Sequence, residues 1–124
     1  MAIYAPPPDP DVDALLPLPP ATFHILLALA DADRHGYAIQ QEIAARTDGA
    51  VRMSAGTLYR SIQRMVEQGL IEECDTRPAA GLDDERRRYY RLTPFGLDVT
   101  RAETGRLQAL VQLARAHGVV PGLV

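Results

Sequence analysis

The chain is 124 residues long, the size of one ordinary domain, which argues against an enzyme with a separate cofactor domain. Cys74 is the only cysteine, so the sequence excludes an intramolecular disulfide and any metal site with two cysteine ligands. The formal net charge is −3, but three aspartates near the start account for it, and from Ala14 onward arginines and acidic residues are equal in number. The charge balance therefore does not exclude a nucleic-acid-binding protein, although such proteins usually carry an excess of basic residues. Met1 is followed by neither a basic segment nor a long apolar run, so we expect a soluble, cytoplasmic protein without membrane contact.

Residues 1–20 hold seven of the ten prolines. Proline fixes the backbone and removes a hydrogen-bond donor, so this segment is predicted to be an extended arm that cannot be helical. Leu15, Leu16 and Leu18 give its second half apolar side chains. We expect that half to dock onto the body of the domain.

Two helices are predicted next. The first begins at Thr22 and is apolar on two sides, with Phe23, Leu26, Leu27 and Ala30 on one and Ile25, Ala28 and Leu29 on the other. One side would pack in its own domain and the other against a partner subunit. The polar run 31–35 ends it, and a second helix is expected from Gly36 to Arg46, with Ile39 and Ile43 in the core.

A third helix is predicted from Ser54, a good N-cap, to about Gln68, with Gly69 ending it. Its apolar face consists of Leu58, Ile62, Met65 and Val66. The opposite face is polar and free of acidic residues, and consists of Thr57, Arg60, Ser61, Arg64 and Gln68. Glu67 is predicted to point a quarter-turn away from this polar face.

The rest of the chain predicts a hairpin and a long helix. The strands are Leu70–Cys74 and Arg86–Leu92, joined by a polar tip. Thr93 and Pro94 then open a helix that could reach Ala116 or His117. Its apolar stripe finds no obvious partner inside so small a domain and is assigned to dimerisation; it consists of Leu107, Leu110, Val111 and Ala114.

This order of elements predicts a mainly α fold with a small β-hairpin wing, a winged helix-turn-helix followed by a C-terminal dimerisation helix. The expected units are a Pro-rich arm (1–20), a DNA-binding domain (21–93) and the dimerisation helix with its tail (94–124). The third helix would enter a major groove, which an acid-free face permits. From periodicity alone, Arg60 and Arg64 could equally be ordinary solvated surface residues.

Three segments carry a family resemblance: His35-Gly36-Tyr37 with Ile39; Gly56-Thr57-Leu58-Tyr59 with Gly69-Leu70-Ile71; and Arg88-Tyr89-Tyr90-Arg91-Leu92-Thr93-Pro94 with Gly96. In their order and spacing they resemble the PadR family of bacterial transcriptional regulators, over most of residues 20–100. The resemblance implies a DNA-binding winged helix, dimerisation through the C-terminal helix with help from the N-terminal one, and repression usually relieved by a small molecule. The single C-terminal helix is similar to that of the compact subgroup.

Carried onto this sequence, the resemblance implies contacts from the third helix: Ser54 and Thr57 for phosphates, and Arg60, Ser61 and Arg64 for base edges. Tyr37 lies on the outer side of the second helix, where it could bind a phosphate or be a partly buried aromatic. Helical geometry places Tyr59 on the apolar side, which favours packing over a phosphate contact.

The wing leaves two interpretations open. Arg77, Arg86 and Arg87 could enter a minor groove, or they could form salt bridges with the neighbouring Asp83, Asp84 and Glu85. Alternation along the second strand places Arg88, Tyr90 and Leu92 on the same face as Arg86 and predicts that Tyr90 and Leu92 belong to the core.

No catalytic motif is present, so an enzyme is not expected. His24, His35, His117 and Cys74 match no metal-ligand spacing, and we expect neither metal nor cofactor. The predicted function is a homodimeric repressor that binds a palindromic DNA operator; the alternative is a winged-helix module for protein contact. A small-molecule effector could bind between the first and last helices, although the same residues could be a filled core: Phe23, Leu27, Leu107 and Val111. Phe23 and Leu27 are also candidates for the dimer interface.

Overall fold

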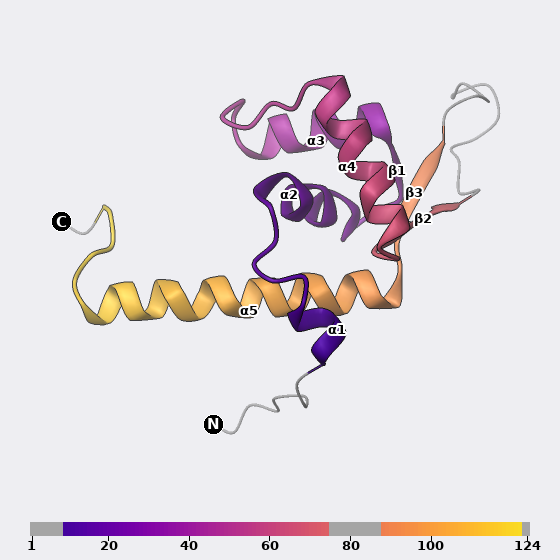
Figure 1. Cartoon of the computed structure of the whole chain (residues 1–124). Helices are drawn as coiled ribbons and strands as arrows, with labels where there is room; N and C mark the ends of the chain where they lie inside the picture. The colour runs from indigo at the N-terminus through magenta and orange to yellow at the C-terminus, as the bar shows by residue number, and fades with distance from the viewer. Residues whose placement is uncertain (1–8, 75–87, 123–124) are drawn as a thin grey trace.

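A computed structural model describes residues 9–74 and 88–122. In chain order its elements are α1 (Pro10–Asp13), α2 (Pro20–Leu29), β1 (Arg34–His35), α3 (Gly36–Arg46), α4 (Ala55–Glu67), β2 (Ile71–Cys74), β3 (Tyr89–Leu92) and α5 (Pro94–Ala116). Figure 1 shows α2, α3 and α4 gathered into one body with the sheet at its edge, while α5 runs beneath this body and α1 lies beside α5. No helix in the described part of the chain is long and apolar enough to cross a membrane.

The core lies where α2 meets the helices above it and α5 below. Ile25 and Leu26 of α2 are fully buried, as are Ile39 of α3 and Leu58 of α4. Val99, from the first half of α5, closes the core from below. The apolar spacing of the sequence therefore predicts these core residues of the helices, and one contiguous cluster holds the helices together.

The helix boundaries agree with the capping signals. The Ser54 side chain accepts a hydrogen bond from the Thr57 backbone N–H at 3.1 Å, so α4 begins where the N-cap predicts. Thr93 caps α5 in the same way at Gly96, with Pro94 in the first turn. Gly69 follows α4 with a φ of +76°, a conformation that favours glycine. Val66 departs from the prediction, because it is 40% exposed rather than part of the core.

The wing is a three-stranded antiparallel sheet in the order β1-β3-β2, not the predicted two-stranded hairpin. The polar run 31–35 predicts a simple connection, but Arg34 and His35 pair with Tyr90 and Tyr89 of β3. His35 meets the Tyr89 ring edge to face, with centroids 5.3 Å apart. Tyr89 is therefore buried on the face opposite Tyr90, which is also buried, while Leu92 is half-buried.

The N-terminal arm contains a helix, which corrects the prediction that it cannot be helical. The Asp9 carboxylate accepts hydrogen bonds from the backbone N–H groups of Asp11 and Val12, at 2.9 and 3.4 Å. Pro10 fits because it occupies the first helical turn, where the missing N–H would have no helical partner. The expected docking is confirmed, since Val12 and Leu18 are buried in the core cluster.

Glu103 fastens this arm to α5. Its side chain is 2% exposed, accepts the Leu18 backbone N–H at 3.0 Å and forms an ion pair with Arg106. The hydrogen bond from Arg106 holds the pKa of Glu103 below its ordinary value of 4.5, against the opposing effect of burial. A buried charge is tolerated here because both of its oxygens have partners.

Glu103→Gln is expected to lower the free energy of unfolding by about 2 kcal/mol at pH 7, because a charge-assisted hydrogen bond becomes a neutral one. The folded state lowers this pKa, so the stabilisation is complete above pH 4.5 and is lost as the pH falls through the lowered value. Urea unfolding of both proteins between pH 7 and pH 3 measures this. A stability difference that stays constant below pH 4.5 would contradict the assignment.

Candidate nucleic-acid interface

The predicted contact residues of α4 lie together on its outward side. Ser54, Arg60 and Arg64 are exposed, while Thr57 and Ser61 are half-buried. The second half of this side is a shallow hollow lined by Arg60, Ser61, Gln63, Arg64 and Glu67. The presence of Glu67 corrects the prediction that it points away, so the face is free of acidic residues only over its N-terminal part.

Arg60 and Arg64 form no ion pair with any residue in the described ranges, 9–74 and 88–122. In the same part of the fold, Arg34, Arg46 and Arg91 each pair with a carboxylate. An arginine already paired must give up its partner to bind phosphate, whereas an unpaired guanidinium loses only its hydration. Arg52, Arg101 and Arg115 are likewise unpaired among the described residues, so what distinguishes Arg60 and Arg64 is that both lie on the outward side of α4.

A four-membered ion network occupies two other arginines, at the end of α2 and along α3. Asp31 contacts Arg34 at 3.3 Å and Arg46 at 2.8 Å, and both arginines also reach Glu42. Burial acts to raise the pKa of Asp31, but the hydrogen bond from Arg34 and the charge of Arg46 together lower it. The network joins the end of α2 to α3 and leaves these cations little role at an interface.

Two half-exposed tyrosines lie at the N-terminal end of α3. Tyr37 is half exposed and its ring lies parallel to that of His35, with centroids 6.5 Å apart. Tyr59 of α4 is also half exposed and passes so close to Gly36 that a Cβ added there would lie 2.7 Å from its hydroxyl oxygen. The packing predicted for Tyr59 is thus present on one side of the ring, while the other side stays open.

Sequence reasoning missed two residues. His35 caps α3, because its Nδ1 accepts the Ala38 backbone N–H at 3.1 Å. Arg52 is exposed, precedes the Ser54 cap by two residues and pairs with no carboxylate in the described ranges. A cation just before the N-cap of α4 was the available signal for Arg52.

The wing tip cannot be compared with its prediction, since Arg77, Arg86 and Arg87 lie outside the described residues, as do Asp83, Asp84 and Glu85. At the base of the wing the arginines are paired across the strands. Arg88 lies 3.3 Å from Glu73, and Arg91 lies 2.9 Å from Glu72. These exposed pairs neutralise the base of the wing and contribute little stability.

The residues assigned to dimerisation lie on two helices, with Phe23 and Leu27 on α2 and the other four at helical spacing along α5. Leu110 and Val111 are about half exposed, while the remaining candidates are half-buried: Phe23, Leu27, Leu107 and Ala114. All the buried residues of α5 lie between Gly96 and Glu103. Figure 1 shows the second half of the helix extending away from the body toward the C-terminus.

The chain shares its family and fold with known proteins. Residues 25–102 match the model of the transcriptional regulator PadR-like family. Transcriptional regulator Rv3488 of Mycobacterium tuberculosis is 36% identical over 92 residues, 74% of this chain and 77% of that protein. A Lysinibacillus sphaericus protein named "Uncharacterized protein X" is 36% identical over 72 residues, so the match spans 58% of this chain and only 63% of that one.

Solved structures show the same architecture. A transcriptional regulator from Clostridium thermocellum superposes with a TM-score of 0.64 at 24% identity, over 89% of this chain and 97% of that one. Bacillus subtilis PadR, solved in complex with operator DNA, gives 0.54 at 18% identity, over 65% of this chain and 44% of that one. These likenesses confirm the predicted winged helix-turn-helix fold with a C-terminal helix.

Proposed function

We propose that this chain, which belongs to the PadR-like family of transcriptional regulators, acts as a homodimeric repressor that binds a roughly palindromic operator on double-stranded DNA. One observation carries the DNA contact: Arg60 and Arg64 project from α4 without a carboxylate partner in the described ranges. The Bacillus subtilis PadR complex, a relative in fold, supports DNA as the partner.

In this proposal α4 enters the major groove. Its guanidinium groups would read base edges, because an arginine fork matches the two acceptors of guanine. Ser61 lies on the same side of the helix and would support this reading.

The N-terminal end of α4 would hold phosphates. The Ser54 hydroxyl donates to Thr57 Oγ1 at 3.1 Å, which leaves the Thr57 hydroxyl hydrogen free for a phosphate oxygen. Ser54 is then a capping and positioning residue, and Thr57 makes the contact.

Further contacts would come from both sides of α4. Tyr37 and Arg52 flank it and would bind the backbone, which fixes the register of the helix. The wing arginines Arg77, Arg86 and Arg87 would reach the adjacent minor groove. In a symmetric dimer, two α4 helices would occupy major grooves about 34 Å apart, one helical turn of DNA. The operator would therefore be palindromic, and a small molecule would relieve repression.

Arg60→Ala and Arg64→Ala are each expected to weaken operator binding by about 1 to 3 kcal/mol if the side chain reads a base, with loss of preference at one base position. Fluorescence anisotropy with the DNA upstream of this gene and a scrambled duplex, at two salt concentrations, measures both effects. Arg101→Ala is the matched control, because Arg101 is exposed on α5, away from α4.

Unchanged affinity in both α4 variants would show that this face does not bind DNA. Weak and equal binding to both duplexes, with little salt dependence, would favour the alternative of a winged-helix module that binds another protein. The balanced charge of the chain after Ala14 supports this alternative, because a neutral domain attracts DNA only weakly at long range.

A further inference from the structure

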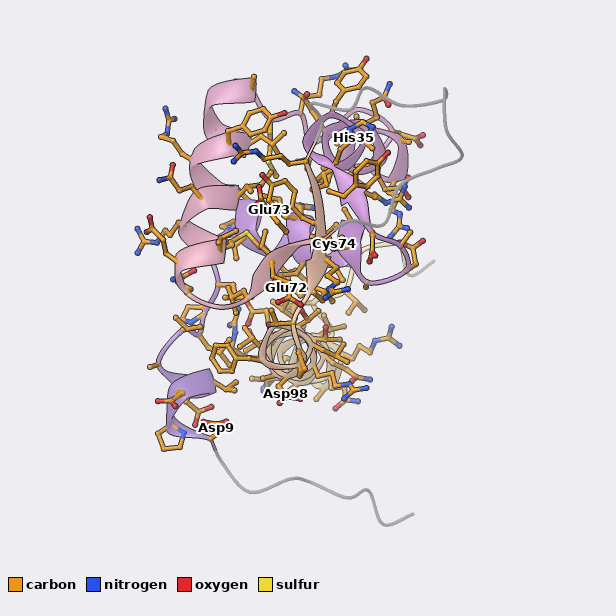
Figure 2. The ribbon with its side chains drawn as sticks, turned by 90° about the vertical axis from the view of Figure 1, so that its right-hand side faces the viewer. Asp9, His35, Glu72, Glu73, Cys74 and Asp98 are labelled. Atoms are coloured by element: carbon orange, nitrogen blue, oxygen red, sulfur yellow. The ribbon has the colours of Figure 1, made fainter. Side chains whose placement is uncertain are left out.

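A hollow of about 570 Å³ lies between α4 and the strands of the wing. We refer to this space as the wing hollow. From α4 it is lined by Tyr59, Ile62, Gln63 and Val66, and from the strands mainly by Glu73 and Tyr90. Figure 2 shows Glu73 on the side of the sheet that faces α4. Its volume falls within the range of ordinary small-molecule sites.

The wing hollow explains why two side chains of α4 are exposed. Tyr59 and Val66 lie on the side predicted to be apolar and packed, yet each keeps about half of its surface open. Both line the hollow, so the sheet does not approach α4 closely enough to cover them. Ile62 lies between them in the sequence and is buried at the floor. The result is an apolar, partly aromatic wall that no side chain in the described part of the chain covers.

A buried polar group points into the same space. Tyr90 is 7% exposed and lines the wing hollow, and its hydroxyl makes no hydrogen bond with any residue in the described ranges. Burial raises the pKa of Tyr90, and the negative charge of Glu73 adds to this, so the group stays protonated. Because the hollow is open to solvent, water hydrates this hydroxyl in the empty protein, and an acceptor atom on a ligand would take the place of that water.

The charges at the rim determine which ligands fit. Glu73 is paired with Arg88, and Glu72 is paired with Arg91. Of these four groups, the two carboxylates and Arg88 line the hollow, so the lining contributed by the described residues, 9–74 and 88–122, carries one more negative than positive charge. These charges would repel an anion. A cation would find no available carboxylate among them, because Glu72 and Glu73 are each paired with an arginine. An uncharged ligand fits this lining best.

We propose that the wing hollow binds a flat, uncharged aromatic molecule with one hydrogen-bond acceptor, which receives the Tyr90 hydroxyl hydrogen while the ring lies on Tyr59 and Val66. The regulatory consequence rests on the proposed function, in which α4 and the wing bind adjacent grooves. A ligand bound between α4 and the wing would fix the distance between these two elements and so change the affinity for DNA. This site is separate from the space between α2 and α5 considered from the sequence.

Quinoline is the probe, because it is flat, uncharged at pH 7 and carries one ring nitrogen as acceptor. Naphthalene has the same shape without the acceptor, and 2-naphthoate adds a negative charge. Titrations of the full chain without DNA, followed by NMR, should show saturable binding of quinoline, with shifts at the Gln63 side-chain amide and the Val66 methyl groups. Naphthalene should bind about tenfold more weakly, and 2-naphthoate more weakly than quinoline.

Tyr90→Phe should weaken quinoline binding about tenfold and leave naphthalene binding unchanged. Tyr89→Phe is the matched control, since it removes a hydroxyl from the opposite face of the same strand and should leave quinoline binding unchanged. Val66→Trp gives a second test that does not alter the core, because Val66 is 40% exposed and the larger ring would fill the hollow. It should abolish quinoline binding.

Absence of saturable binding, shifts centred on Leu110 of α5, or equal affinities for wild type and Tyr90→Phe would overturn the proposal. DNA binding is measured separately by anisotropy, with and without quinoline. A protein that binds DNA but not quinoline refutes the wing hollow and leaves the proposed function standing. A protein that binds quinoline through Tyr90 but binds no DNA supports the hollow as a site and refutes the proposed function.

Discussion

Gly96→Ala is expected to lower the free energy of unfolding by about 3 kcal/mol, at the upper end of the usual cost of overpacking. A Cβ added at Gly96 would lie 1.9 Å from the carbonyl oxygen of Leu70, far inside van der Waals contact. This oxygen cannot move away freely, because it accepts the Thr93 backbone N–H at 3.1 Å. The first turn of α5 would have to shift, and with it the junction that joins α5 to the end of α4.

Gly105→Ala in the same helix is the matched control. Apart from its own helix, no atom of the described residues lies within 4 Å of a Cβ added at Gly105, and alanine favours the helix more than glycine does. This variant should gain about 0.5 to 1 kcal/mol. Urea unfolding followed by circular dichroism at 222 nm measures both. A Gly96→Ala protein as stable as wild type would show that α5 does not lie against Leu70.

Local signals explain why the helices could be predicted from the sequence. Ser54 and Thr93 cap their helices through atoms only three residues away, so the sequence contains the whole interaction. The same holds for Gly69, whose backbone conformation ends α4. The ends of these helices are therefore set by local contacts and do not depend on how the helices pack together.

The errors in the fold arise from contacts between distant segments. Strand β1 has two residues, too few to show alternation, and it exists because β3 pairs with it. Its pairing buries Tyr89, which the alternation of β3 alone leaves facing solvent. The prediction that Val66 is packed is wrong for the opposite reason, because the distance between α4 and the sheet leaves this side chain uncovered. Periodicity indicates which face of an element is apolar, not how closely a neighbour approaches it.

For the candidate site, the helical wheel predicts the exposure of Arg60 and Arg64, because both lie opposite the buried Leu58 and Ile62. The helical wheel cannot predict that they have no carboxylate partner in the described ranges. Nothing in the sequence distinguishes them from Arg34 and Arg46, which pair with carboxylates brought close by the fold. That no described residue hydrogen-bonds the Tyr90 hydroxyl is likewise a consequence of packing, which periodicity does not reveal.

Leu110→Glu is expected to dissociate the proposed homodimer. Leu110 is half exposed in the single chain, so a carboxylate there is solvated in the monomer and costs that monomer little. In a symmetric interface built on the α5 stripe, two such carboxylates would be buried without partners. An unpaired buried charge costs about 3 kcal/mol or more, which raises the dimer dissociation constant at least about a hundredfold. Sedimentation velocity over a range of protein concentrations measures this.

Gln112→Glu is the matched control, because it introduces the same carboxylate two residues further along α5, on the other side of the helix. It should leave the dimer intact. If α4 reads two half-sites, the monomeric Leu110→Glu protein should also lose operator affinity while each α4 remains unaltered, since one helix in one groove lacks the contacts of its partner. A Leu110→Glu protein that sediments as wild type would show that subunits associate elsewhere, and the stripe on α5 would then need a different partner.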